Sequence, residues 1–145
     1  MLALERFDQE CGVLIRQLEK IGVLDNTLIF MTSDNGMPFP RAKANLYDYG
    51  TRMPLAIYWK GKIRAGLTIE EFISFVDFGP TILTAVGLPN PGSFHGTSFL
   101  PLLNETGPIA PRNQVFMERE RHANVRKGDL SYPSITYSFK MVKIQ

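Results

Sequence analysis

The sequence predicts an α/β fold, with a parallel or mixed sheet and flanking helices, and three observations lead to this prediction. A helical pattern covers the first twenty residues, a polar turn occupies residues 24–26, and an apolar strand pattern covers residues 27–32. Helix, short turn and buried strand form the repeating unit of parallel α/β sheets. The 145 residues, 44% of them hydrophobic and 21% charged, have the composition of a globular domain with one core.

The first helix is predicted from apolar residues that recur every three or four positions. These residues are Leu4, Phe7, Cys11, Leu14, Leu18 and Ile21. Gly22 comes next and suits the left-handed conformation that ends a helix. Because Cys11 falls on the apolar face and no histidine lies near it in the sequence, we expect a buried small hydrophobic residue and not a nucleophile.

The strand at residues 27–32 is apolar without alternation, so we expect both of its faces to be covered. It runs directly into Ser33-Asp34-Asn35-Gly36. A buried strand that ends in a carboxylate and a carboxamide brings two oxygen ligands to the rim of a sheet, where α/β enzymes keep their chemistry. The same residues also favour tight turns, so a simple turn is the alternative interpretation.

A loop, two strands and a short helix follow in the first part of the chain. Pro38 and Pro40 predict an extended loop, and apolar runs at residues 53–59 and 72–76 predict a second and a third strand. Asp77 is the expected cap of a short helix that has Pro80 in its first turn and ends at Gly87.

The pattern changes from about Ser93, where the apolar runs become shorter and turn residues more frequent. Apolar and polar residues alternate from Ile135 to Met141, which predicts a half-exposed antiparallel strand. We therefore expect residues 1–92 to be part of an α/β core and residues 93–145 to begin a small antiparallel β subdomain. Both ends of the sequence look like continuations of a longer protein.

Charge and composition argue against several classes of protein. The formal charge is +2, from 16 Lys+Arg against 14 Asp+Glu, and the charges are interleaved, so a nucleic-acid partner is not expected. No apolar run approaches the roughly 20 residues that span a bilayer, so no membrane association is expected, and no targeting signal is recognisable. A single cysteine excludes an internal disulfide and a cysteine-based zinc site.

Two ordered motifs carry a family resemblance. Residues 24–36, which end in Ser33-Asp34-Asn35-Gly36, resemble the sulfatase segment that closes the strand of the calcium site, and Val76-Asp77-Phe78-Gly79-Pro80 resembles a later helix start of that family. The loop that contains Lys43 is similar in sequence to the corresponding loop of the sulfamidase group, the N-sulfoglucosamine sulfohydrolases of heparan sulfate breakdown. The resemblance covers the chain as the carboxyl-terminal part of an alkaline-phosphatase-like fold.

The resemblance implies a metal site and a substrate site. Sulfatases use calcium and a formylglycine nucleophile, and by resemblance Asp34 and Asn35 are two calcium ligands. Lys43 matches the position at which the family places a cation against the sulfate group. Glu120, Arg121 and His122 match residues that face the sugar in sulfamidase-like enzymes.

The formylglycine motif, Cys/Ser-x-Pro-x-Arg, is not found in these residues. Cys11 is followed by Val13 and Ile15 where proline and arginine are required. Ser131 is followed by Pro133, but Ile135 stands in place of the arginine. We therefore expect this segment to be inactive alone.

The favoured function is that of a fragment of a sulfatase acting on sulfate esters or N-sulfates of heparin or heparan sugars. The first alternative is a phosphate or phosphonate ester hydrolase of the same superfamily, and the second is a non-catalytic folded remnant. An isolated apolar strand has an unpaired edge, so we expect self-association. The resemblance also implies a periplasmic or secreted bacterial protein.

Overall fold

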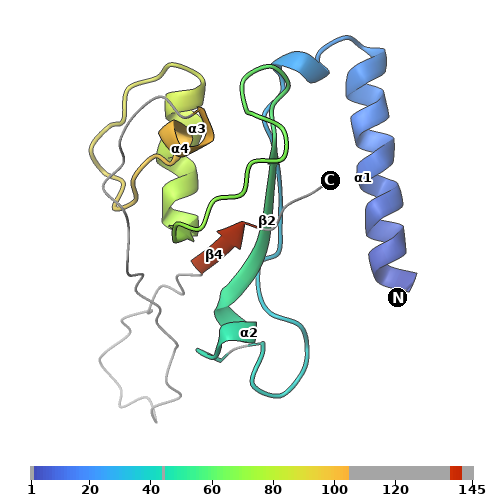
Figure 1. Ribbon diagram of the computed structural model, residues 1–145, viewed down its shortest axis with the longest axis vertical. Coiled ribbons are helices and arrows are strands. Elements are labelled where there is room, and N and C mark those ends of the chain that lie inside the picture. The colour runs from blue at the N-terminus through green and yellow to red at the C-terminus, as the bar shows by residue number, and fades with distance from the viewer. Residues whose placement is uncertain (1, 44, 105–137, 142–145) are drawn as a thin grey trace, which may run out of the picture.

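The computed structural model describes residues 2–43, 45–104 and 138–141 (Figure 1). The chain begins with a long helix, continues with a strand, a rim loop and a second strand, and then forms two short helices beside the sheet. The elements are α1 (Leu2–Lys20), the 3₁₀ turn η1 (Leu24–Asn26), β1 (Ile29–Thr32), α2 (Asp48–Thr51), β2 (Arg52–Tyr58), β3 (Ile73–Ser74), the 3₁₀ turn η2 (Phe75–Asp77), α3 (Phe78–Ala85), α4 (Leu100–Asn104) and β4 (Ser138–Met141).

The four strands form one mixed sheet in the order β1-β2-β4-β3. β1 runs antiparallel to β2, with Ile29 opposite Tyr58 and Thr32 opposite Leu55. β2 runs parallel to β4, and β4 runs antiparallel to β3. The mixed α/β class is therefore confirmed. The parallel arrangement expected around the first strand is wrong, because β2 returns from the rim loop in the opposite direction.

β1 lies at the edge of this sheet, and all four of its residues are half-buried. The expectation that both faces are covered is met only in part: Phe30 packs on Phe78 of α3, and α1 stands beside the sheet (Figure 1), but no residue of β1 is fully buried. The second predicted strand is confirmed as β2. The third, expected over residues 72–76, is shortened to β3 because η2 begins at Phe75.

The predicted first helix and its end are confirmed, but its burial is not. Gly22 adopts a φ of 73°, and the N–H of Val23 donates to the Leu18 carbonyl at 3.0 Å, which closes the helix. No residue of α1 is buried, and Leu4 is 72% exposed. Cys11 is half-buried, so its expected burial is wrong, since the apolar face of α1 has no tight neighbour among the described residues.

The core lies between the sheet and the segment that carries α3 and α4. It contains aliphatic residues from β2, β3 and α4, joined by Phe99; its buried members are Met53, Leu55, Ile69, Ile73, Phe99, Leu100 and Leu103. Phe30 of β1 stacks on Phe78 of α3 with ring centroids 5.3 Å apart, and Phe99 meets Phe78 edge-on at 5.7 Å. The aromatic contacts therefore fix β1 against α3.

The second predicted helix is α3, with Pro80 in its first turn as expected and Gly87 at a φ of 73° after its end. Asp77 precedes the helix, but its carboxylate does not cap α3. It accepts the Ser74 N–H at 2.7 Å and the Thr97 N–H at 2.9 Å. Asp77 therefore connects the turn before α3 to the later loop.

β4 was expected as an antiparallel strand of a separate subdomain. It lies between β2 and β3 in the same sheet, parallel to the one and antiparallel to the other. The division of the chain at residues 92 and 93 stays a prediction. None of the helices in the described ranges has the length and apolar character needed to cross a membrane.

Candidate functional site

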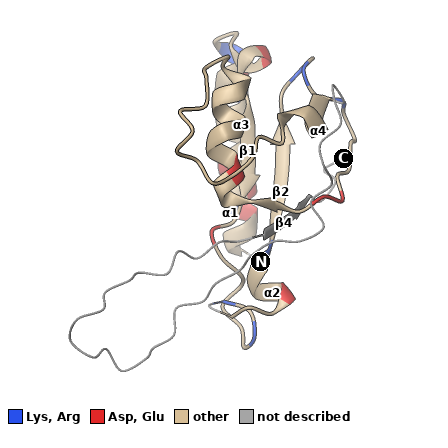
Figure 2. Ribbon diagram, turned by 90° about the vertical axis from the view of Figure 1, so that its left-hand side faces the viewer, with Lys and Arg blue, Asp and Glu red and all other residues tan. Residues whose placement is uncertain are grey.

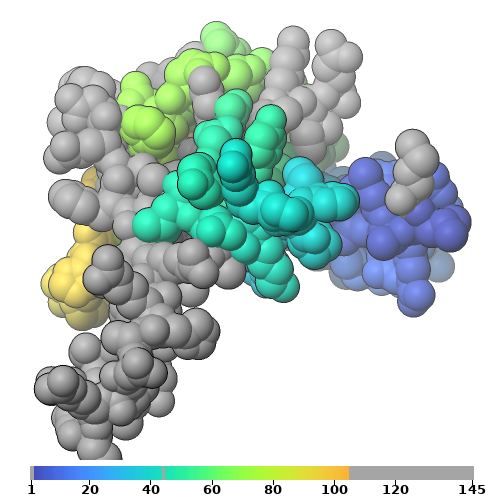
Figure 3. Space-filling view, turned by 90° about the horizontal axis from the view of Figure 1, so that it is seen from below, coloured from blue at the N-terminus to red at the C-terminus, as the bar shows by residue number. Residues whose placement is uncertain are grey.

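The rim segment, residues 33–50, follows β1 and leads through α2 into β2. Ser33 Oγ donates to the backbone carbonyl of Asn35 at 2.8 Å, which fixes the turn at the end of the strand. Thr32 Oγ1 donates to the Pro54 carbonyl at 2.8 Å and connects the strand end to β2. The turn therefore has a defined position relative to the sheet. Figure 3 shows the rim segment, coloured cyan to teal, on the face seen from below.

The loop that carries Lys43 is closed by its own backbone. The carbonyl of Met37 accepts the N–H of Phe39 at 2.8 Å and that of Lys43 at 3.0 Å. Arg41 adopts the left-handed conformation, with a φ of 62°, in the middle of this closed turn. Lys43 follows with an exposed side chain.

Two arginines near Lys43, one within this loop and one after α2, have partners of their own. The guanidinium of Arg41 lies 5.9 Å from the centroid of the Tyr47 ring. Arg52 Nη1 lies 3.6 Å from Asp48 Oδ2. Figure 2 shows the basic residues of the described segments spread over several elements, without one continuous stripe. Within the described part of the rim segment, Lys43 is therefore the basic residue whose side chain is left for a ligand.

Asp34 and Asn35 have the chemistry of calcium ligands. Asp34 is exposed and Asn35 is half-buried, and no hydrogen bond or ion pair within the described residues engages either side chain. Carboxylate and carboxamide oxygens are hard donors, so this pair fits a calcium ion, which takes six to eight oxygen ligands. The described residues contain no group of three His, Cys, Asp or Glu side chains that could hold a metal. Glu120, Arg121 and His122 lie outside the described residues.

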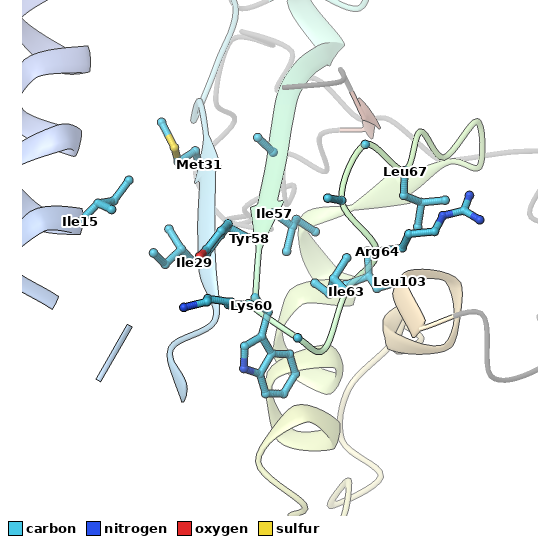
Figure 4. A pocket seen from close by; sticks show the side chains of 15 residues that line it. Ile15, Ile29, Met31, Ile57, Tyr58, Lys60, Ile63, Arg64, Leu67 and Leu103 are labelled. Atoms are coloured by element: carbon cyan, nitrogen blue, oxygen red, sulfur yellow. The ribbon is translucent and has the colours of Figure 1, made fainter. Parts of the chain in front are cut away.

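A separate cavity is lined by residues of β1 and β2 and by the loop at residues 59–67, with Ile15 of α1 and Leu103 of α4 completing it (Figure 4). Its volume is about 510 Å³, and its lining includes Ile15, Ile29, Met31 and Ile57. Asp34, Asn35 and Lys43 do not line it. The lining is mostly apolar but includes Lys60 and Arg64, and it is separate from the rim segment that carries the predicted site residues.

Sequence reasoning missed two features near the rim and the core. Asp77, predicted as a helix cap, is 2% exposed and holds two backbone N–H groups from different segments. Gly36 and Gly50 are buried and bring three backbone segments of the rim together. The sequence did offer two signals of these contacts: an acidic residue before a helix, and glycines beside polar loops. Neither signal shows which distant segment the residue contacts.

The comparisons with known proteins agree with the predicted resemblance. The family model described as Sulfatase matches residues 2–88. The human protein named N-sulphoglucosamine sulphohydrolase is 35% identical over 97% of this chain and 27% of its own length. The protein named N-acetylglucosamine-6-O-sulfatase from Bacteroides thetaiotaomicron is 39% identical over 93% of this chain and 25% of its own length.

A third relative, named Ulvan-active sulfatase, comes from Formosa agariphila. It is 40% identical over 64% of this chain and 16% of its own length. The chain thus spans about a quarter or less of the length of these relatives. Because the family model covers more than half of the 145 residues, this chain belongs to the sulfatase family.

Proposed function

We propose that this chain is part of a sulfatase that hydrolyses a sulfate ester or an N-sulfate (sulfamate) of a heparin-type or heparan-type sugar. The observation that supports it most is the pair Asp34 and Asn35, whose side-chain oxygens have no partner among the described residues and lie at the end of β1, next to the loop that carries Lys43. The names of two relatives that match nearly the whole chain, one an N-sulphoglucosamine sulphohydrolase and one an N-acetylglucosamine-6-O-sulfatase, support the substrate class.

In this proposal the rim residues have separate roles. Asp34 and Asn35 hold calcium through a carboxylate and a carboxamide oxygen, and Lys43 places a compact positive charge against the sulfate oxygens. Calcium held by Asp34 and Asn35 would neutralise charge on the sulfate oxygens, and the family's formylglycine, which is not encoded in these residues, would supply the nucleophile. Lys43 would also stabilise negative charge on the sulfuryl oxygens while the S–O or S–N bond to the sugar breaks and the sugar oxygen or nitrogen leaves.

The sugar is recognised in this proposal by Glu120, Arg121 and His122. Hydroxyl and N-sulfate groups offer both donors and acceptors, and a carboxylate, a guanidinium and an imidazole can match them. A bacterial enzyme of this kind would work in the periplasm or outside the cell, where its polymeric substrate is found. Its partner is the sulfated sugar and neither nucleic acid nor membrane.

Metal binding can be tested on the chain itself by following backbone amide shifts during a calcium titration. We expect the Asp34 and Asn35 amides to respond with a dissociation constant on the order of 10⁻³ M, since two ligands make a weak site. Asp34→Asn should remove the response. Asp48→Asn is the matched control, because Asp48 is an exposed aspartate of the same rim that faces Arg52. A response that survives Asp34→Asn would refute the metal assignment.

Activity can be tested by exchanging this segment for the matching segment of the two relatives. We expect desulfation of N-sulfated glucosamine in the N-sulphoglucosamine sulphohydrolase scaffold, and a loss on the order of 10²-fold in kcat for Lys43→Ala. Arg41→Ala is the control, because its guanidinium stacks on Tyr47. Phosphate ester hydrolysis without desulfation would favour the phosphatase alternative, and folded but inactive chimeras would oppose both.

A further inference from the structure

The rim segment contains a contact between backbones that only glycine permits. Gly36, which follows Asp34 and Asn35, is buried, and a Cβ added to it would collide with the Tyr49 carbonyl oxygen and lie 3.0 Å from the Gly50 Cα. The backbone of α2 therefore lies directly against the turn that carries the two oxygen ligands.

Gly50 has a second backbone segment on its other side. A Cβ at Gly50 would collide with the carbonyl oxygens of Ala42 and Asn45 and lie 3.1 Å from the Asn45 carbonyl carbon. These two residues flank Lys43 in the sequence. Gly50 thus lies between the turn of Asp34 and Asn35 and the loop of Lys43.

The Lys43 backbone is held on both sides of its Cα. Its N–H donates to the Met37 carbonyl at 3.0 Å, and its carbonyl accepts from Asn45 Nδ2 at 3.1 Å. The Asn45 N–H also donates to the Ala42 carbonyl at 3.1 Å. The loop that rests on Gly50 therefore fixes where the Lys43 side chain begins.

Space, and not backbone conformation, is the reason for glycine at these positions. Glycines with positive φ lie elsewhere, for example Gly61 at 69°, and neither Gly36 nor Gly50 is among them. An alanine at either position would meet backbone atoms, which cannot rotate away as the end of a long side chain can. The two glycines are thus required by close approach.

We propose that Gly50 is a positioning residue, which sets Lys43 at a fixed place relative to Asp34 and Asn35. This inference rests on the proposed function, in which Asp34 and Asn35 bind calcium and Lys43 binds the sulfate group. Gly50 contacts no substrate in this proposal. It acts by letting α2 fit between the two backbones that carry the functional side chains.

The test uses the full chain and three Gly→Ala variants. Gly50→Ala is the test variant, and Gly12→Ala is the benign control, because a Cβ there meets only the flexible Arg16 side chain at 3.2 Å. Gly79→Ala is the destabilising control, since its Cβ would lie 2.6 Å from Phe94 Cε1, a ring outside the rim segment. Comparison with Gly79→Ala separates a local effect from a general loss of stability.

The first readout is hydrogen exchange at the Lys43 amide, which needs neither metal nor substrate. We expect Gly50→Ala to speed exchange at Lys43 by at least about tenfold relative to β2 amides, whereas both controls leave this ratio unchanged. The second readout is the change in the Lys43 amide chemical shift during a sulfate titration. This change should be several-fold smaller in Gly50→Ala than in the wild type, and unaltered in the two controls. An unchanged exchange ratio in a folded Gly50→Ala chain would overturn the proposal.

Two further outcomes are informative. If Gly50→Ala does not fold, Gly36→Ala replaces it, because its Cβ would press on the Tyr49 carbonyl oxygen and the Gly50 Cα and so displace α2 from the other side. Exchange at Lys43 that is unchanged in folded Gly36→Ala would then overturn the proposal. If the wild-type chain shows no response to sulfate or calcium, the proposed function fails, while the exchange ratio still decides whether Gly50 positions Lys43.

Discussion

Thr97 and Asp77 are joined across twenty residues of chain, with the Thr97 N–H donating to Asp77 Oδ1 at 2.9 Å. The other carboxylate oxygen accepts the Ser74 N–H at 2.7 Å. Thr81 adds to the same cluster, because its Oγ1 donates to the Asp77 carbonyl at 2.6 Å and accepts the Phe99 N–H at 3.0 Å. The start of α3 and the segment that enters the core are thus held by one buried polar cluster.

Asp77→Ala should destabilise the chain by about 2 kcal/mol, because the buried Ser74 N–H and the Thr97 N–H lose their acceptors. The measurement is urea unfolding followed by circular dichroism. Asp48→Asn should change the free energy of unfolding by less than about 0.5 kcal/mol, because both partners of its ion pair are exposed. Equal effects of the two substitutions would contradict the assigned role of Asp77.

Leu55→Ala should cost about 2–5 kcal/mol of unfolding free energy, because it leaves a cavity in the core. Leu55 is 1% exposed and lies on β2, between β1 and β4. Leu4→Ala is the matched control on α1, and its effect should stay within about 0.5 kcal/mol because Leu4 is exposed. Comparable losses in the two variants would show that α1 is buried in solution.

Sequence patterns correctly predicted the helices and strands that depend on residues close together in the chain. The three- and four-residue period predicted α1, Gly22 and Gly87 predicted two helix ends, and an apolar run predicted β2. Each signal depends on residues within a few positions of one another, where propensity and pattern act directly. The α/β class followed from these elements.

Strand direction and the packing of the rim depend on contacts between distant segments. β4 inserts between β2 and β3 although the sequence order suggests a separate unit, and its alternating pattern says nothing about which strand it joins. The position of Asp34 after a strand was predicted from its neighbours in sequence. The layering of Gly36 against Gly50 was not, because a glycine gives no sign of the backbone that approaches it.

The ion pair of Lys60 and Asp25 should make a pH-dependent contribution to stability. The Lys60 ammonium lies 2.8 Å from Asp25 Oδ1, and this hydrogen bond raises the pKa of Lys60 above its ordinary value. A raised folded-state pKa means that the contribution to stability is present below the ordinary lysine pKa and is lost as pH rises through the folded value. Asp25→Asn should therefore lower the pKa of Lys60. The check is an NMR titration of the Lys60 side chain between neutral and alkaline pH.

The control for Lys60 is Asp8→Asn, which removes an exposed carboxylate of α1 and should leave the Lys60 titration in place. A Lys60 pKa that does not respond to Asp25→Asn would show that the pair does not persist in solution. Both groups are exposed, so we expect the effect on overall stability to be small.

The apolar side formed by α1 and β1 leads us to propose that this chain self-associates with a second copy. β1 pairs only with β2 among the described strands, so its outer edge offers unpaired backbone groups, and antiparallel pairing of two such edges makes a closed two-fold contact. Ile15, Ile29 and Met31 line the adjoining cavity, so pairing would also shield apolar surface.

Sedimentation velocity at micromolar concentration should therefore show dimers or larger species for the wild-type chain. Met31→Lys should give monomers, because an edge lysine opposes strand pairing and would be desolvated in the contact. Met37→Lys adds the same charge on the rim loop, where Met37 is already exposed, and should sediment like the wild type. A compact wild-type monomer, or dissociation caused equally by both substitutions, would exclude association through the β1 edge.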